Sequence, residues 1–203
     1  MPSQIKAIIF DFGGVLVDWS PHNLYKEFLP DTAAIDAFLE EVDFYHWNAL
    51  QDKGRPFAEA VAVHSAKFPH RADLIQAYAD NWINSVTGMK AEVVDLFYTL
   101  KEKGYPVYGL SNWSAETFPL VREQFTFLND LDHIVLSGEV KMIKPEPEIF
   151  HYLLSHIPES AEECLFIDDS LANIETAQRL GFETVHFQSA EGLAEKLKHH
   201  GLL

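Results

Sequence analysis

Four short runs of apolar residues are spaced along the chain, and each is followed by a segment with helical spacing. The runs are residues 7–10, 107–110, 164–167 and 184–187. Such runs, with little polar alternation, are typical of strands that are covered on both faces. Strands that alternate with helices favour a parallel sheet. We therefore predict an α/β fold: a Rossmann-like parallel sheet flanked by helices.

The helical segments each carry one apolar stripe. In residues 91–103 the apolar positions repeat every three or four residues, and Gly104 follows as a stop signal. A second helix is predicted to open at Pro145-Glu146 and to run through Leu154. Ser170 is expected to cap a third helix. These stripes are interpreted as core packing.

The first two predicted strands are separated by about ninety-five residues, far more than one crossover helix needs. Most of this segment is predicted to be helical, near residues 21–29, 32–42, 57–68 and 72–86. We therefore expect an inserted all-helical cap of residues 19–86. Residues 1–18 and 87–203 then form the α/β core.

The amino-acid composition indicates which kinds of binding partner to expect. The 203 residues include 15 Lys and Arg against 31 Asp and Glu, a net charge of −16. This balance argues against nucleic-acid binding, which needs clustered basic side chains. No apolar run is long enough to span a membrane, and the N-terminus lacks the features of a signal peptide. With the single cysteine, Cys164, excluding an intrachain disulfide, we expect a cytoplasmic protein.

Polar residues stand where the predicted strands end. Asp11 follows the first strand, Ser111 and Asn112 follow the second, and Asp168 and Asp169 follow the third. Ligands of open parallel sheets bind at this edge. Carboxylates gathered there repel one another, and Mg²⁺ with oxygen ligands relieves the repulsion. Together with the cation Lys144, this set is typical of a phosphate site.

Four motifs in this order resemble those of the haloacid dehalogenase-like hydrolase superfamily. They are Asp11-Phe12-Gly13-Gly14-Val15, Leu110-Ser111-Asn112, Lys144-Pro145 and Phe166-Ile167-Asp168-Asp169-Ser170. Each motif alone is weak, but the set spans nearly the whole chain. The resemblance is to the helical-cap phosphatase branch, including glucose-1-phosphate phosphatase-type members. It implies a phosphoric monoester hydrolase that acts on a small phosphorylated metabolite.

The resemblance also implies how the reaction proceeds. Asp11 attacks phosphorus and forms an aspartyl-phosphate, which water then hydrolyses. Asp11, the backbone carbonyl of Gly13 and Asp169 are expected to hold Mg²⁺. Asp168 is expected in or near the second shell of the metal.

A second set of residues is expected to contact the phosphoryl group. Ser111 and the backbone amides near Phe12 and Asn112 are implied as phosphate ligands. Lys144 is implied as a catalytic residue that neutralises both the nucleophile and the transferring group. These roles agree with the general rule that enzymes catalyse phosphoryl transfer mainly by positioning the reactants and stabilising charge.

Gly13 departs from the pattern of the family. Phosphatases of the superfamily usually carry an acid/base Asp there, and its loss is expected to slow turnover by about 10²–10⁴-fold. We therefore expect a substrate whose leaving oxygen needs little protonation, such as a sugar 1-phosphate, an aryl phosphate or an acyl phosphate. A cap histidine, His22 or His46, is an alternative source of the proton.

The cap is expected to set specificity. The aromatic turn at residues 44–47, followed by residues 52–55, is predicted to lie over the site. Trp19 and Trp113 flank the first two motifs. These aromatic side chains suit stacking on a sugar ring, and packing in the core is the alternative.

Two other functions stay open. One is a metal-independent 2-haloacid dehalogenase, which the acidic pair Asp168-Asp169 disfavours because that branch has neutral residues there. The other, motivated by Gly13, is a catalytically weak phosphate-binding protein. The physiological substrate and the oligomeric state are left open.

Overall fold

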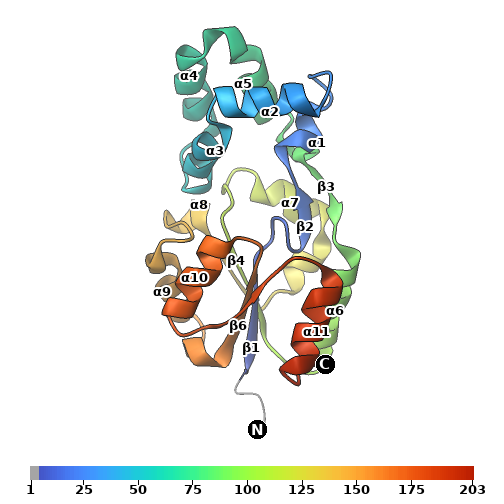
Figure 1. The fold of residues 1–203 in the computed structure, drawn as a ribbon. Coiled ribbons are helices and arrows are strands. Elements are labelled where there is room, and N and C mark those ends of the chain that lie inside the picture. Colours follow the sequence, from blue (N-terminus) through green and yellow to red (C-terminus); the bar gives the residue numbers. More distant parts are fainter. Residues whose placement is uncertain (1–4) are drawn as a thin grey trace.

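A five-stranded parallel sheet forms the centre of the fold (Figure 1). The computed structural model describes residues 5–203. Residues 1–4 lie outside the described residues, and with them the start of the predicted core and the N-terminal stretch considered as a signal peptide. The strand order is β5-β4-β1-β6-β7, and all neighbouring strands are parallel. The bounds are β1 Ala7–Phe10, β4 Val107–Ser111, β5 His133–Leu136, β6 Cys164–Asp168 and β7 Glu183–His186.

Alternate residues of β1 point to opposite faces of the sheet, and helices cover both faces. Ile8 and Phe10 pack in one buried cluster with side chains of α6 and α11, whereas Ile9 packs in a second cluster with α9 and α10. A strand buried on both faces has no place for a polar side chain, which explains its continuous apolar run. These helices are α6 Ala91–Glu102, α9 Pro147–Leu154, α10 Leu171–Arg179 and α11 Ala190–His199.

The predicted α/β class is confirmed, and the four predicted strands match β1, β4, β6 and β7 to within one residue. The prediction missed β5, a short edge strand in which three of the four residues are apolar. The helix expected from Pro145 begins at Pro147. Short elements connect the rest, namely α7 Phe118–Gln124, α8 Ser137–Val140 and the 3₁₀ turns Thr126–Asp130 and Ala161–Glu163.

A separate layer of helices stands beyond the carboxyl ends of the sheet strands (Figure 1). It contains α1 Pro21–Tyr25, α2 Thr32–Glu41, α3 Phe44–Asp52, α4 Phe57–Lys67, α5 Ala72–Asp80 and the 3₁₀ turns Pro69–Arg71 and Trp82–Ser85. An antiparallel pair, β2 Val17–Trp19 and β3 Val86–Met89, connects this layer to the sheet. The predicted cap boundaries at residues 19 and 86 fall on this pair, where Trp19 is the partner of Val86.

Two predictions for the helical layer need correction. Residues 44–47 are the first turn of α3 and not an aromatic turn. Its buried positions, Phe44, Trp47, Asn48 and Gln51, follow helical spacing. The Phe44 ring packs edge-on against Tyr78 of α5 at 4.9 Å between centroids, which fixes α3 inside the layer. The helix predicted over residues 72–86 ends at Asp80.

Cys164, in β6, is a free cysteine with no exposed surface. Burial, and secondarily the charges of Glu159 and Glu163, raise the pKa of its thiol to about 12. Because the thiolate is the reactive form, we expect no reaction of the native protein with Ellman's reagent and one thiol per chain in guanidinium chloride. Rapid labelling without denaturant would contradict this placement. In the described part of the chain, no helix has the length and apolarity to cross a membrane.

Candidate active site

Three strand ends bring the predicted acidic residues together. Asp11 directly follows β1, Asp168 is the last residue of β6, and Asp169 comes next. One carboxylate oxygen from each of these three residues lies within 4.8 Å of the other two. Asp168 is fully buried and Asp11 nearly so, whereas Asp169 is exposed. Three carboxylates at this spacing need positive charge between them.

Lys144 supplies one such charge from inside the protein. Its Nζ lies 2.6 Å from Asp168 Oδ2 and 3.0 Å from Asp11 Oδ1, and it donates to the carbonyl of Leu110 at 2.8 Å. Burial alone lowers the pKa of Lys144, but the charges of Asp11 and Asp168 raise it above its ordinary value. The ammonium group is therefore a fixed cation beside the candidate nucleophile.

Asn112 holds Lys144 in place. Its Nδ2 donates to the Lys144 carbonyl at 2.9 Å, and its Oδ1 accepts from the Lys144 amide at 2.8 Å. The Asn112 side chain is thus committed to the backbone of Lys144. The predicted phosphate contact at this position therefore depends on the Asn112 backbone amide.

The hydrogen bonds to the Asp11 carboxyl group all end on one oxygen. The Phe12 amide at 2.7 Å, the Ser111 hydroxyl at 2.8 Å and Lys144 all contact Oδ1. No hydrogen bond from the described residues ends on Oδ2. Burial raises the pKa of Asp11 to about 7; the charge of Lys144 opposes this rise, and that of Asp168 adds to it. The carboxyl group therefore has one held oxygen and one available for chemistry.

Asp168 and Asp169 differ in their surroundings although they are neighbours in sequence. Asp168 accepts from Lys144, from the Ser170 amide at 2.8 Å and from Asn173 Nδ2 at 3.0 Å to each oxygen. Ser170 thus contacts Asp168 through its backbone, and its side chain makes no capping hydrogen bond to α10. Burial first, and then the charge of Asp168, raise the pKa of Asp169. Asp169 is thus exposed at the mouth of the cluster, whereas both oxygens of Asp168 are engaged by Lys144 and Asn173.

Gly14 leaves room for Asp169. Its φ is +79°, and a Cβ added there would lie 2.1 Å from Asp169 Oδ2. We expect Gly14→Ala to displace this carboxylate and to lower Mg²⁺ affinity, measured by calorimetry, by about 10–100-fold. Gly104→Ala is the matched control, because Gly104 has φ +87° with no atom within 4 Å of the added Cβ. Equal affinities in the two variants would contradict a metal-holding role for Asp169.

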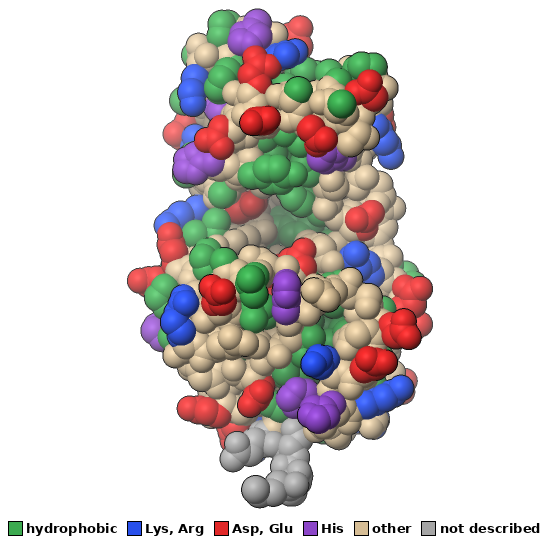
Figure 2. Space-filling model, in the orientation of Figure 1, with side chains coloured by type: hydrophobic (Ala, Val, Ile, Leu, Met, Phe, Trp, Pro, Cys, Tyr) green, Lys and Arg blue, Asp and Glu red, His purple; other side chains and the backbone are tan. Residues whose placement is uncertain are grey.

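A small cavity adjoins the acidic cluster, between the helical layer and the sheet. Its volume is about 60 Å³, and it is lined by Gly13, Trp19, Asn48, Asp52, Trp82, Asn112 and Trp113. Figure 2 shows the hollow between the two layers, with hydrophobic side chains above it. The predicted positions of Trp19 and Trp113 next to the site are thus observed. Asn48, Asp52 and Trp82 join them from the helical layer.

The histidine alternative for the proton donor is not supported. Neither His22 nor His46 lines the cavity. His22 Nε2 lies 2.7 Å from Asp36 Oδ1 on α2, and His46 is exposed. Asp52 belongs to the segment that was predicted to lie over the site, but the prediction gave it no chemical role; it lies one helical turn after Asn48 in α3. This i, i+4 spacing was visible in the sequence once the segment was taken as a helix.

Comparisons with known proteins agree with this arrangement. A family model for haloacid dehalogenase-like hydrolases matches residues 5–181. The chain is 30% identical over 201 residues to D-ribitol-5-phosphate phosphatase of Bacteroides thetaiotaomicron, covering 93% of this chain and 94% of that protein. It is 29% identical to the sesquiterpene phosphatase astK of Aspergillus oryzae, covering 98% and 97%.

A solved structure gives the same result for the fold. The HAD family enzyme bt-2542 of Bacteroides thetaiotaomicron, in a magnesium complex, superposes with a TM-score of 0.73 at 25% identity, covering 96% of this chain and 99% of that one. This chain belongs to the haloacid dehalogenase-like hydrolases. Within the family, its acidic cluster and its phosphatase relatives assign it to the phosphoric monoester hydrolases.

Proposed function

We propose that this protein is a magnesium-dependent phosphatase that hydrolyses a small phosphomonoester, with sugar and polyol phosphates favoured. The observation that carries the proposal is the environment of Asp11. Oδ1 is held by Phe12, Ser111 and Lys144, and Oδ2 is left to attack. A carboxylate nucleophile held in this way splits hydrolysis into two easier steps, through an aspartyl-phosphate.

The residues around Asp11 have separate tasks in this proposal. Oδ2 of Asp11 attacks phosphorus, and water later releases the phosphoryl group from Asp11. The Ser111 hydroxyl and the backbone amides near Phe12 and Asn112 bind phosphoryl oxygens. Lys144 stabilises the charge of the transferring group.

The donor set fits Mg²⁺. Asp11 and Asp169 offer carboxylate oxygens close together, and a hard cation that prefers oxygen ligands binds through one or two carboxylates and the phosphate of its substrate. The Gly13 carbonyl is the proposed third protein ligand. Asp168 is engaged by Lys144 and Asn173, which supports an outer position for it. When bound, the ion neutralises carboxylate charge and polarises a phosphoryl oxygen.

The cavity supports a compact, hydroxylated leaving group. Asn48 and Asp52 offer hydrogen bonds, and three tryptophans offer flat apolar walls, a combination that suits a short sugar or polyol. The relative that is named for a ribitol phosphate supports this choice. The cavity is small, so we propose that the helical layer, residues 19–86, acts as a cap that moves to admit substrate. Cys164, free and buried, is compatible with the cytoplasm, which we propose as the compartment.

The test is an assay of phosphate release from sugar phosphates, polyol phosphates, nucleotides and a terpenyl phosphate, with Mg²⁺ or with EDTA. We expect the short hydroxylated substrates to be hydrolysed best and EDTA to stop the reaction. A preference for the terpenyl phosphate would contradict the substrate class. Activity that persists in EDTA, or halide release from a 2-haloacid, would favour the dehalogenase alternative and contradict the proposed function.

A further inference from the structure

The cavity beside Asp11 contains one ionisable side chain, and it comes from the helical layer. Of the residues that line the cavity, only Asp52 carries a group able to give or take a proton. Gly13, on the side of the core, has no side chain at all. An alkoxide leaving group needs a proton as its bond to phosphorus breaks. A residue that lines the cavity therefore has to supply this proton.

We infer that Asp52 is a further catalytic residue, which protonates the leaving oxygen and then activates the water. The inference rests on the proposed phosphatase function. In the first step, Asp11 Oδ2 forms a bond to phosphorus while the bond from phosphorus to the leaving oxygen breaks, and Asp52 gives its proton to that oxygen. In the second step, water attacks phosphorus, the bond to Asp11 breaks, and Asp52 takes the water proton. Alcohol and phosphate leave, and both carboxyl groups return to their initial states.

The Asp52 carboxyl group is held by a chain of buried polar groups. Asn48 Nδ2 donates to Asp52 Oδ2 at 2.9 Å, and the Tyr78 hydroxyl donates to Asn48 Oδ1 at 2.9 Å. Asn48 and Tyr78 are both buried. The amide of Asn48 is therefore oriented by Tyr78, and in turn it orients Asp52. A general acid needs such fixed geometry at the reacting atoms.

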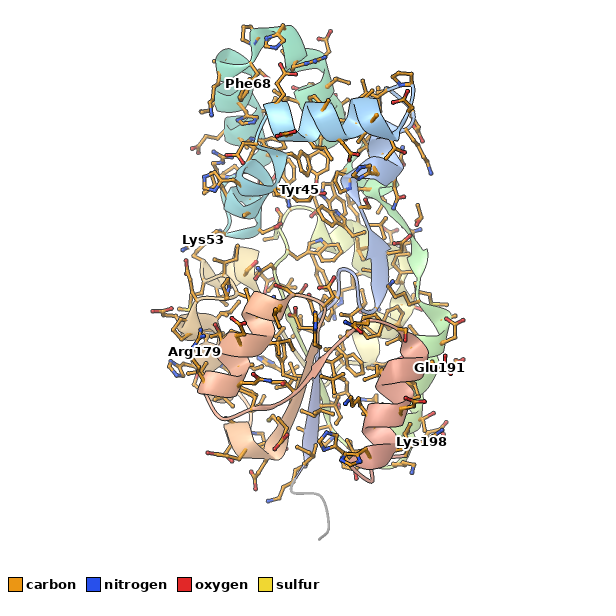
Figure 3. All side chains as sticks on the ribbon, viewed as in Figure 1. Tyr45, Lys53, Phe68, Arg179, Glu191 and Lys198 are labelled. Carbon is orange, nitrogen blue, oxygen red and sulfur yellow. The ribbon has the colours of Figure 1, made fainter. Side chains whose placement is uncertain are left out.

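The backbone near Asp52 is also tied to the core. The Ser137 hydroxyl donates to the Asp52 carbonyl, and the Lys141 ammonium group donates to the carbonyl of Gly54 at 3.2 Å. Lys53, which lies at the core end of α3 in Figure 3, pairs with Glu146 at 2.6 Å. These contacts hold the end of α3 against the core. Asp52 thus belongs to the assembled site and not to the helical layer alone.

The surroundings of Asp52, burial above all, favour its protonated form. Burial raises its pKa to about 8; a hydrogen bond from the Ser114 backbone opposes the rise, and the negative charge of Asp11 adds to it. Tyr78, the other ionisable group in contact with this network, stays neutral because burial raises its pKa well above the ordinary value. The neighbouring cation, Lys53, is paired with Glu146. A carboxylic acid that keeps its proton near neutral pH is suited to donate it.

The test compares Asp52→Asn with the wild type on phosphate esters of graded leaving-group pKa, from dinitrophenyl to simple alkyl phosphates, with Mg²⁺. We expect kcat/KM to fall by about 10²–10⁴-fold for alkyl phosphates and to change little for dinitrophenyl phosphate, whose leaving group needs no proton. The matched control is Asp36→Asn, an exposed carboxylate of the same helical layer that pairs with His22. An equal loss for all leaving groups, or no loss, would overturn the inference.

A second readout concerns the water step. With dinitrophenyl phosphate, Asp52→Asn should release a burst of dinitrophenol equal to the enzyme concentration, because the aspartyl-phosphate then waits for an unassisted water. A kcat equal to that of the wild type, without a burst, would overturn the base role. Asp52→Ser carries the same expectations, so the result does not depend on one variant folding, and melting curves check both. Wild-type protein that has no Mg²⁺-dependent activity would instead contradict the proposed function.

Discussion

Replacing Lys144 by methionine is expected to stop hydrolysis and to lower the free energy of unfolding of the metal-free protein by about 3–5 kcal/mol, as removal of one partner from a buried ion pair does. Lys144 contacts both Asp11 and Asp168, and all three side chains are nearly or completely buried. Without the ammonium group, two carboxyl groups stay buried with no counterion. Denaturant unfolding in EDTA measures the loss of stability.

Lys53→Met is the matched control for this prediction. Lys53 also forms an ion pair, with Glu146, but both side chains are more than two-fifths exposed. Exposed pairs contribute about 0–1 kcal/mol, so this variant should stay close to the wild type. Equal destabilisation by Lys144→Met and Lys53→Met would contradict the role of Lys144 as the internal counterion of the site.

Asp11→Asn is expected to abolish turnover while leaving the metal-free protein at least as stable as the wild type near pH 8. Loss of a nucleophile lowers kcat by a factor on the order of 10⁴–10⁶. The free energy of unfolding depends on the protonation of Asp11, because the pKa of Asp11 is raised in the folded protein to about 7. The folded state then binds more protons than the unfolded state between about pH 4 and 7, and its stability falls as pH rises through that window. The amide removes this contribution.

The pH dependence of melting in EDTA checks the sign. The melting temperature of Asp11→Asn should exceed that of the wild type most at pH 8, and the difference should shrink as pH falls toward 4. A variant that is inactive because it is unfolded would contradict the prediction. So would an advantage that grows toward low pH.

The sequence was sufficient to predict those site residues that lie at the ends of strands. Asp11 and Asp168 follow or end continuous apolar runs, and parallel strands must end at the same edge of the sheet, so their convergence was predictable. The edge strand β5 was missed because its apolar run, residues 134–136, is only three residues long. A run this short is below the length at which an apolar pattern predicts a strand.

The contribution of the helical layer was not predictable in the same way. Asp52 reaches the cavity because α3 is packed through Phe44 and Trp47 against Tyr78, and because its end is bound to the core by Ser137. These contacts join segments that are distant in sequence, and no local spacing specifies them. A cap histidine, His22 or His46, is the alternative proton donor that the sequence suggests, whereas the fold places the carboxyl group of Asp52 in the cavity.

Asp11 is proposed to carry the phosphoryl group, and this group can be trapped on the protein. The enzyme is mixed with substrate and Mg²⁺, quenched in acid and reduced with borohydride, which converts a phosphorylated aspartate to homoserine. Mass spectrometry then locates the change in the tryptic peptide of residues 7–26, which holds Asp11 and Asp18. We expect homoserine at position 11, and none in Asp11→Asn. Homoserine at position 18, or at no position while wild-type enzyme turns over, would contradict this role of Asp11.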